Sequence, residues 1–328
     1  MRYLITGGAG FIGSHLTEAL TARGDQVTVL DDLSTGTESN LRPLLDSSNL
    51  EFVRGSTLDA ELTEWVVSGA DTVVHLAATV GVQLVVQDPL GALKNNILGT
   101  ETVLESCAKY GPKVLIASTS EIYGKNTSDR LSEDADRIVG PPTTTRWAYA
   151  TSKVVDEIFA YEFCRQRGTP TIVVRLFNCS GPKQTGAYGM VIPRFVRQAL
   201  QGEELTVFGD GQQTRCFCHI DDTVEALTGL LGERRAVGGV FNVGGSREIS
   251  MYELAELVIG LAGSSSGIRL VSYEEAYEPG FEDMRRRVPD TTRIRNLIGW
   301  EPQRSVESII EDVIAYERSA MGAEVPVQ

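Results

Sequence analysis

The sequence of 328 residues predicts an α/β protein with a doubly wound parallel sheet in its first half, followed by a smaller mixed α/β region. Six apolar runs of strand length alternate with segments of helical periodicity, which is typical of a parallel sheet covered by helices on both faces. A glycine-rich turn joins the first run to the first helix. Beyond about residue 178 the strands become shorter and the loops contain more glycine and proline.

The expected elements follow in order along the chain. The six strands lie near residues 3–6, 26–30, 51–53, 71–78, 113–119 and 171–178. Helical periodicity that stops at a glycine occurs at 16–24 and 95–111. The later region adds short strands at 205–208 and 240–245 and helices at 251–263 and 305–320. We expect the substrate in the cleft between the two regions, at the carboxyl ends of the strands.

The segment TGGAGFIGSH, directly after the first strand, has the spacing of a dinucleotide-binding turn. Gly7 makes the tight turn, Gly10 lets the backbone approach a pyrophosphate, and Gly13 lets the helix pack closely on the strand. The helix that begins around Phe11 and Ile12 then presents its free N–H groups to the phosphates. The alternative interpretation is a glycine turn in an α/β domain that binds no cofactor.

Two acidic residues at the end of the second strand indicate which dinucleotide is bound. Asp31 and Asp32 follow the apolar run QVTVL, about twenty residues after the turn. An acidic side chain at this place hydrogen-bonds the adenosine ribose and repels a 2′-phosphate. We therefore expect NAD as the cofactor and not NADP. If no cofactor binds, both residues are ordinary solvated acids.

The composition excludes several classes of partner. A formal net charge of −14 offers no positive field to a nucleic acid or an anionic membrane, so an anionic substrate needs local arginines. The sequence shows no signal peptide and no apolar run of membrane length, and its five cysteines lack paired C-x-x-C spacing, so we expect a reduced, cytoplasmic protein. Cys216 and Cys218 would share one face of a strand. Because only His219 lies near them, buried thiols are favoured and no metal site is expected.

Tyr149 and Lys153, in the run RWAYATSK, are candidate catalytic residues. Four residues apart, they lie on one face of a helix, where an ammonium lowers the pKa of a phenol and also reaches a nicotinamide ribose. The strand-end run STSE places hydroxyls at Thr119 and Ser120 and a carboxylate at Glu121 beside them. Each residue also has a structural interpretation, as a helix-face aromatic, a solvated lysine or a strand-end cap.

In sequence order, these motifs are similar to those of the extended short-chain dehydrogenase/reductase superfamily, within its nucleotide-sugar epimerase, dehydratase and decarboxylase branch. The resemblance covers nearly the whole chain, through TGGAGFIG, HLAA, STSEIYG, YATSK, RLFNCSGP, GDGQQTRCFCHIDD, FNVGG and RRRVPD. It implies an NAD-binding Rossmann domain over residues 1–178, rejoined by about 216–247, and a mainly nucleotide-sugar-binding domain over 179–328. It also implies a homodimer formed through the helix at 95–110 and the helix that carries Tyr149.

The resemblance implies a role for each matching residue around the cofactor. Tyr149 is the base that takes a proton from a sugar hydroxyl, Lys153 lowers its pKa, and Thr119 orients the same proton. Ser120 and Glu121 complete the catalytic set. Further cofactor contacts are expected at Leu58, Ala77 and Asn96, of which Asn96 lies near the nicotinamide.

For the substrate, the resemblance implies that Asn178 contacts the phosphates and that Arg215 and Arg287 clamp the diphosphate. The remaining expected contacts are Val191, Thr206 and Phe208 around the base and Asp290 on a ribose hydroxyl. Guanidinium groups match phosphate oxygens, which supports the two arginine roles independently. The alternative for Arg287 is membership of a solvated charge run.

We expect a UDP-sugar 4-epimerase. Dehydratases of this branch carry an Asp-Glu pair where this chain has Ser120 and Glu121, so 4,6-dehydration is not expected. The alternatives are a UDP-glucuronate decarboxylase, a UDP-glucuronate 4-epimerase and, in a different class, a catalytically silent NAD-binding regulatory protein. Many glucuronate-acting relatives hold the sugar carboxylate with an arginine after Pro182, which this chain lacks, and a buried carboxylate without a cation is costly. For such a sugar Arg146, one turn before Tyr149, would have to hold the carboxylate.

Overall fold

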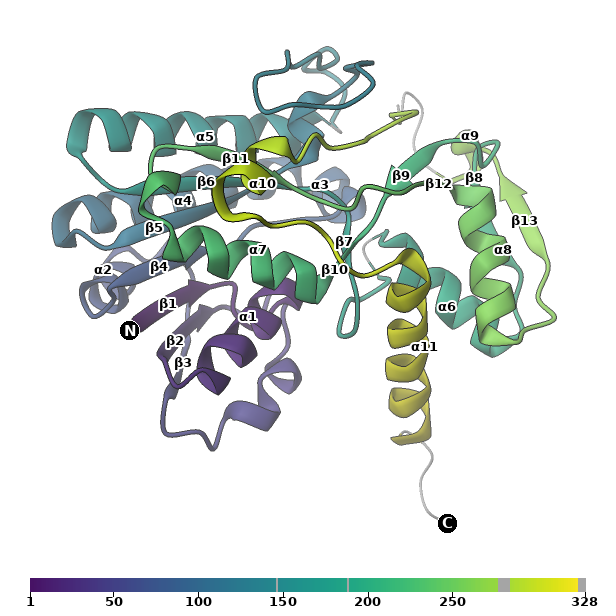
Figure 1. The fold of residues 1–328 in the computed structure, drawn as a ribbon, viewed down its shortest axis with the longest axis horizontal. Helices are drawn as coiled ribbons and strands as arrows, with labels where there is room; N and C mark the ends of the chain where they lie inside the picture. Colours follow the sequence, from purple (N-terminus) through teal and green to yellow (C-terminus); the bar gives the residue numbers. More distant parts are fainter. Residues whose placement is uncertain (146, 188, 277–283, 324–328) are drawn as a thin grey trace.

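A computed structural model describes residues 1–145, 147–187, 189–276 and 284–323. Its centre is a seven-stranded sheet in the order β11-β6-β5-β4-β1-β2-β3, with every neighbouring pair parallel (Figure 1). The strands are β1 (Arg2–Thr6), β2 (Gln26–Asp31), β3 (Leu50–Arg54), β4 (Thr72–His75), β5 (Lys113–Thr119), β6 (Thr171–Leu176) and β11 (Val240–Val243). The predicted doubly wound parallel α/β fold is confirmed. β11 joins the sheet from the second half of the chain.

Strand β1 shows why the sheet is covered on both faces. Tyr3 and Ile5 pack into one apolar core, whereas Leu4 packs into another, because successive side chains of a strand point to opposite faces. The first core contains side chains of α1 (Phe11–Ala22) and α7 (Ile220–Gly232). The second contains side chains of α2 (Ala60–Ser68), α4 (Pro89–Tyr110) and α5 (Trp147–Arg167).

One helix begins earlier than the periodicity predicted. α1 begins at Phe11, directly after the glycine turn as expected, whereas α4 begins at Pro89 and not near residue 95. The Asp88 side chain accepts a hydrogen bond from the Gly91 N–H, and proline suits the first helical turn, so this terminus is defined by its cap and not by an apolar stripe. The predicted end is confirmed, since Gly111 closes α4 with a φ of 83°.

The smaller region has an apolar core of its own. Helices α6 (Val191–Gln201), α8 (Met251–Ala262) and α11 (Val306–Ala323) contribute to it together with the parallel pair β8 (Leu205–Phe208) and β13 (Ile268–Val271). The remaining elements are short: α3 (Val82–Gln87), β7 (Cys179–Ser180), β9 (Thr214–Cys216), β10 (Cys218–His219), β12 (Glu248–Ser250), α9 (Tyr273–Ala276) and α10 (Thr292–Ile298). Cys216 and Cys218 therefore lie on different strands and not on one, because the chain changes partner between β9 and β10.

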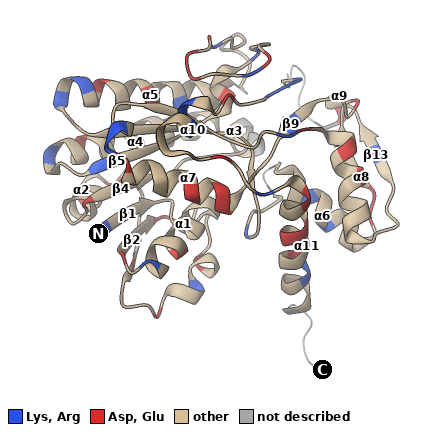
Figure 2. Cartoon of the chain, in the orientation of Figure 1, with Lys and Arg blue, Asp and Glu red and all other residues tan. Residues whose placement is uncertain are grey.

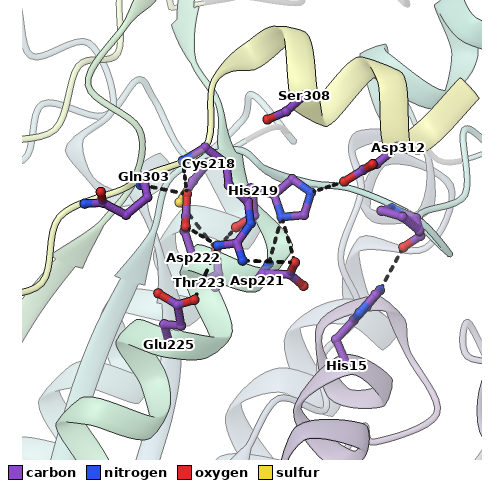
Figure 3. A network of polar contacts seen from close by, with 12 residues as sticks. His15, Cys218, His219, Asp221, Asp222, Thr223, Glu225, Gln303, Ser308 and Asp312 are labelled. Carbon is purple, nitrogen blue, oxygen red and sulfur yellow. Dashed lines mark hydrogen bonds and ion pairs between the residues drawn. The ribbon is translucent and has the colours of Figure 1, made fainter.

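Polar contacts fasten α11 to the sheet-bearing part of the chain at the start of α7 (Figure 3). The His219 Nδ1 accepts the Asp221 N–H, so its Nε2 carries the hydrogen and donates to Asp312 of α11 at 3.0 Å. Arg304, just before α11, donates to the buried Asp222 carboxylate at 2.5 Å. These contacts hold the smaller region against the carboxyl edge of the sheet.

The tight packing of α1 on β1 is testable at Gly13. A Cβ at this position would lie 2.2 Å from the Gly7 carbonyl oxygen and 2.6 Å from the Gly8 Cα, which are both backbone atoms. We expect Gly13→Ala to lower the free energy of unfolding by about 1–3 kcal/mol, measured by urea denaturation. Gly260→Ala is the matched control, because Gly260 lies in α8 with open space around its Cβ position. Equal stability of the two variants would contradict the close packing.

Candidate active site

A cavity of about 500 Å³ lies at the carboxyl ends of the parallel strands, between the sheet and the smaller region. This is where ligands bind in doubly wound sheets. The predicted residues that line it are Gly7, Gly10, Phe11, Ile12, Gly13, Asp31, Asp32, Ala77, Thr119, Ser120, Glu121, Tyr149, Lys153, Asn178, Val191, Phe208, Arg215 and Arg287. Residues far apart in the sequence are thus brought to one cleft.

The cofactor end of the cleft consists of the glycine turn and Asp31. Gly10 caps α1 without a side-chain hydrogen bond, so the first N–H groups of the helix remain available for a pyrophosphate. The Asp31 carboxylate accepts the Ala9 N–H at 2.9 Å and the Leu33 N–H at 2.8 Å. A carboxylate has about four acceptor positions, so two remain for ribose hydroxyls. Burial raises the pKa of Asp31, although both N–H groups oppose this. These features fit a bound NAD.

Four predicted contact residues lie outside the cavity lining. Leu58 is 47% exposed, and the lining is formed by its neighbours at 55–57. The Thr206 hydroxyl is hydrogen-bonded to Gln198, and the Asp290 carboxylate accepts the Thr292 N–H at the start of α10. These groups therefore serve local structure here.

Asn96 is the fourth of these residues. Its side chain accepts the Thr79 N–H at 2.8 Å and donates to the Ser152 hydroxyl at 3.1 Å, so it ties the loop after β4 to α5. Asn95 lines the cavity in its place. Neighbouring residues on a helix point about 100° apart, so an offset of one position decides which asparagine faces the cofactor. Arg146, the proposed carboxylate contact, lies outside the described residues.

Tyr149 lies in the first turn of α5, against the end of β5. A hydrogen bond with the Thr119 hydroxyl lowers the pKa of its phenol, as the Arg287 charge does. Burial is the largest influence and raises the pKa above its ordinary value, and the carboxylates of Glu121 and Asp156 act in the same direction. In the protein without cofactor the phenol is therefore protonated at neutral pH.

Lys153 has a partner that the sequence analysis did not identify. Its Nζ lies 2.7 Å from Asp156 Oδ2, and the two side chains are 3% and 0% exposed. Asp156 follows Lys153 by three residues, a spacing that places both on one side of α5. The spacing was visible in the sequence, but the burial of the pair was not.

Arg287 lies at the reaction centre. Its Nη1 is 3.2 Å from the Ser120 hydroxyl oxygen and 3.2 Å from Glu121 Oε1, and the residue is buried. It is therefore a cation within the group of side chains around Tyr149, whereas the sequence analysis assigned it to the diphosphate. Arg215 also lines the cavity, with its Nη1 donating to the Thr214 carbonyl at 2.7 Å.

The charge of the cleft differs from that of the molecule as a whole. Acidic side chains lie on α7, α8 and α11 (Figure 2). Among the described residues of the lining, the cations are Lys153, Arg194, Arg215 and Arg287. Such local positive charge is what an anionic ligand needs in a protein of net charge −14.

A metal centre finds no support in the part of the chain that the structure describes. No group of three histidine, cysteine or acidic side chains there is arranged to hold an ion. Cys216 and Cys218 are free and buried, and burial raises the pKa of each thiol to about 12. No described helix is both long and apolar enough to cross a bilayer.

A family model described as "NAD dependent epimerase/dehydratase family" matches residues 3–244. The chain belongs to this family. It is an NAD-dependent enzyme of the nucleotide-sugar epimerase/dehydratase type within the extended short-chain dehydrogenase/reductase superfamily, and its cofactor is NAD. The predictions of family and cofactor are confirmed.

Two curated relatives are decarboxylases. A UDP-N-acetyl-alpha-D-glucosaminuronate decarboxylase of Bacillus cytotoxicus is 40% identical over 318 residues, which cover 97% of this chain and 98% of the relative. UDP-glucuronic acid decarboxylase 1 of Xenopus tropicalis is 35% identical over 320 residues, which cover 98% of this chain and 73% of the relative.

Two solved structures with the same fold are 4-epimerases. The UDP-glucose 4-epimerase of Thermotoga maritima with UDP-glucose has a TM-score of 0.88 and 31% identity, covering 98% of this chain and 100% of the other. The UDP-glucuronic acid 4-epimerase of Bacillus cereus, in complex with UDP-glucuronic acid and NAD, has a TM-score of 0.88 and 28% identity, with the same coverage.

Replacing the acid of the cofactor site tests the NAD assignment. We expect Asp31→Ala to weaken NAD binding and to relax discrimination against NADP, because the ribose acceptor and the repelling charge are lost together. Asp46→Ala is the matched control, since Asp46 is an exposed acid outside the cavity lining. Titration calorimetry with both dinucleotides measures the effect. If Asp31→Ala discriminates between NAD and NADP as wild type does, another residue sets the cofactor preference.

Tyr149→Phe tests the base. The variant keeps the ring and loses the hydroxyl, so we expect turnover to fall by roughly 10² to 10⁴ while NAD binding stays nearly intact. Tyr161→Phe makes the same change on the same helix at a residue that is 58% exposed, and it should behave as wild type. Near-wild-type turnover of Tyr149→Phe in a steady-state assay would remove Tyr149 from the mechanism.

Proposed function

We propose that the protein decarboxylates a UDP-linked hexuronate through transient oxidation at C4. The observation that carries this proposal is the place of Arg287, a buried cation hydrogen-bonded to Ser120 and Glu121 beside Tyr149. The decarboxylase names of the two curated relatives support the same reaction. This proposal replaces our expectation of a 4-epimerase for a neutral UDP-hexose, because the curated relatives support that reaction less well.

The main argument against a uronate was the lack of a cation for its carboxylate. The loop after Pro182 has no arginine, and a carboxylate buried without a cation is costly. Arg287 meets this need from a different part of the chain, because it reaches the end of β5 where the sugar ring has to lie for Tyr149 to act. The proposal therefore does not depend on Arg146.

The chemistry follows from the groups at the end of β5. NAD, when bound, would supply the redox chemistry by taking up the C4 hydride of the sugar and giving it back later. Tyr149 takes the proton of the C4 hydroxyl, with Thr119 holding the same oxygen, and the resulting C4 ketone is β to the C6 carboxylate. The bond between C5 and C6 then breaks and CO₂ leaves. The electron pair of that bond stays on the sugar and forms an enolate over C4, C5 and the C4 oxygen. One proton is taken up at C5, the hydride returns to C4, and Tyr149 gives its proton back to the C4 oxygen.

Arg287 has two tasks in this scheme. Its guanidinium holds the carboxylate before cleavage, and it then faces the enolate charge that develops after CO₂ has left. Glu121 and Ser120, held against Arg287, lie where the proton for C5 has to enter. The serine also lacks the acidity that a dehydratase needs to expel a hydroxyl group, so the same position favours loss of CO₂ over loss of water.

The substituent at C2 distinguishes two substrates. The Bacillus cytotoxicus relative, which is named for a 2-acetamido sugar, matches almost the full length of both chains, and UDP-N-acetylglucosaminuronate is therefore our first substrate. UDP-glucuronate, named for the Xenopus relative, is the second. A UDP-glucuronic acid 4-epimerase shares the fold of this chain. That reaction would begin with the same oxidation at C4, but it keeps the carboxylate and returns the hydride to the other face of C4.

The tyrosine–lysine pair argues against a catalytically silent regulatory protein, which would have no need of it.

We further propose a homodimer through α4 and α5, the two helices expected from the resemblance. Apolar side chains on both are exposed, with Leu98 at 45%, Ile158 at 51% and Tyr161 at 58%. We also propose that residues 1–178, rejoined by about 216–247, form an NAD-binding part and that residues 179–328 form a mainly nucleotide-sugar-binding part. A cytoplasmic location is proposed as well.

The deciding experiment incubates the purified protein with NAD and, separately, with UDP-N-acetylglucosaminuronate, UDP-glucuronate and UDP-glucose. We expect a uronate to release CO₂ and to give a UDP-linked pentose or 2-acetamido pentose. NMR and mass spectrometry identify the product. Epimerised uronate without CO₂ would support the UDP-glucuronate 4-epimerase. Conversion of UDP-glucose to UDP-galactose alone would return the function to our first expectation.

Arg287→Met separates a carboxylate contact from a diphosphate clamp. If Arg287 holds the carboxylate, kcat/KM for the uronate should fall on the order of 10²-fold or more, while UDP protects the variant against heating as well as it protects wild type. Arg286→Met is the control, because the neighbouring arginine pairs with Glu248 at the surface. Loss of protection by UDP itself would favour the clamp that the sequence analysis predicted.

A further inference from the structure

We propose that Asp156 is a positioning residue for the reaction: it holds Lys153 in place, and its negative charge helps to set the pH at which Tyr149 works as a base. Asp156 and Lys153 lie one turn apart on α5, with Nζ 2.7 Å from Oδ2 and both side chains almost fully buried. Water does not reach a buried charge pair of this kind, so each charge is compensated mainly by the other.

The Asp156 carboxylate is compensated mainly by Lys153. Burial raises its pKa, and the Lys153 ammonium and the Thr100 hydroxyl of α4 act in the opposite direction. Neither carboxylate oxygen has a hydrogen-bond partner in the described part of the chain, so the ion pair is its principal contact. The position of the Lys153 side chain is therefore coupled to this carboxylate.

A buried set of hydrogen bonds runs from α4 to the end of β1. The Thr100 hydroxyl is hydrogen-bonded to His75 Nε2 at 3.1 Å, and His75 Nδ1 is hydrogen-bonded to the Thr6 hydroxyl at 2.7 Å. The Thr6 oxygen accepts the Ala77 N–H at 3.4 Å. Burial, together with the Lys153 charge, lowers the pKa of His75 to about 3, so the ring is neutral and carries one N–H.

These hydrogen bonds connect the cofactor end of the cleft to α4. Thr6 precedes Gly7, the first glycine of the turn, and Ala77 lines the cavity. The Thr6 hydroxyl ties β1 to β4, and His75 ties β4 to α4. Thr100 of α4 also lowers the pKa of Asp156, so the set ends beside the pair of Lys153 and Asp156.

The charge of Asp156 reaches the base as well. Its carboxylate raises the pKa of the Tyr149 phenol, in the same direction as burial and Glu121, and Arg287 opposes it. The titratable and charged groups that face this part of the site come from several elements. They are His75 of β4, Glu121 after β5, Lys153, Asp156 and Glu157 of α5, and Arg287.

Asp156→Asn tests the effect on the base, because it keeps the shape of the side chain and removes its charge. Tyr149 takes the C4 hydroxyl proton only when deprotonated, so kcat rises as the pH passes the phenol pKa. Loss of the nearby negative charge lowers that pKa, and we expect the rising limb of the kcat profile to move to lower pH by roughly one unit. Glu162→Gln, an exposed acid on the same helix, is the control and should leave the limb in place. A limb that stays at the wild-type pH in Asp156→Asn would overturn the proposal.

A second test needs no activity. Lys153→Met leaves the buried Asp156 carboxylate without its cation, so we expect a marked fall in Tm in thermal unfolding without ligands. Adding Asp156→Asn to this variant should recover most of the loss, because the uncompensated charge is then removed. Additive losses in the double variant would show that the two side chains do not depend on each other and would overturn the proposal.

The inference rests only on Tyr149 acting as the C4 base, which decarboxylation and epimerisation share. Failure of the decarboxylase assignment, seen as the absence of CO₂, therefore leaves both tests of Asp156 valid. Conversely, a negative result for Asp156 in the unfolding experiment carries no consequence for the choice of sugar.

Discussion

The close approach of α1 to the end of β1 is the contact on which the rest of the site depends. At Gly13 a single extra carbon would lie 2.2 Å from the Gly7 carbonyl oxygen, so two backbone segments occupy the space that side chains fill elsewhere. This approach aims the helix N-terminus across the carboxyl edge of the sheet. The Asp31 carboxylate then secures the turn by accepting the Ala9 N–H, so the acid that the sequence analysis assigned to the ribose also holds the turn in place.

The electrostatics of the cleft combine opposite demands. An acidic protein has to bind an anionic cofactor and, on our proposal, an anionic sugar, so the cleft needs cations of its own, which Lys153, Arg194, Arg215 and Arg287 supply. Arg287 is buried there and hydrogen-bonded to Glu121, whose carboxylate also raises the Tyr149 pKa. A substrate carboxylate that competes for Arg287 would change the balance of charge around Tyr149 at the moment of binding. The reaction centre is thus sensitive to whether the sugar carries an acid.

Much of the cofactor site was predictable, because its residues are adjacent in the sequence or follow strand ends. The glycine turn, Asp31, Thr119, Tyr149 and Lys153 belong to this group. The sequence was less informative where a helix rotation or a local cap decides which side chain faces the cavity. Asn95 and not Asn96 lines the cavity, and the Asp290 carboxylate is engaged at the start of α10. Side-chain direction on a helix changes by about 100° per residue, which motif order alone does not resolve.

The sequence by itself determined the α/β class, the NAD cofactor and the tyrosine–lysine pair, since each is encoded in short-range periodicity or in spacing within one element. Only the tertiary structure decided which cation stands beside the base. Arg287 meets Ser120 across 167 positions of the chain, in a contact that no local pattern records. It likewise decided that Lys153 is paired with Asp156, because a spacing of three residues gives proximity, whereas the burial that makes the pair consequential comes from the packing of α4 on α5.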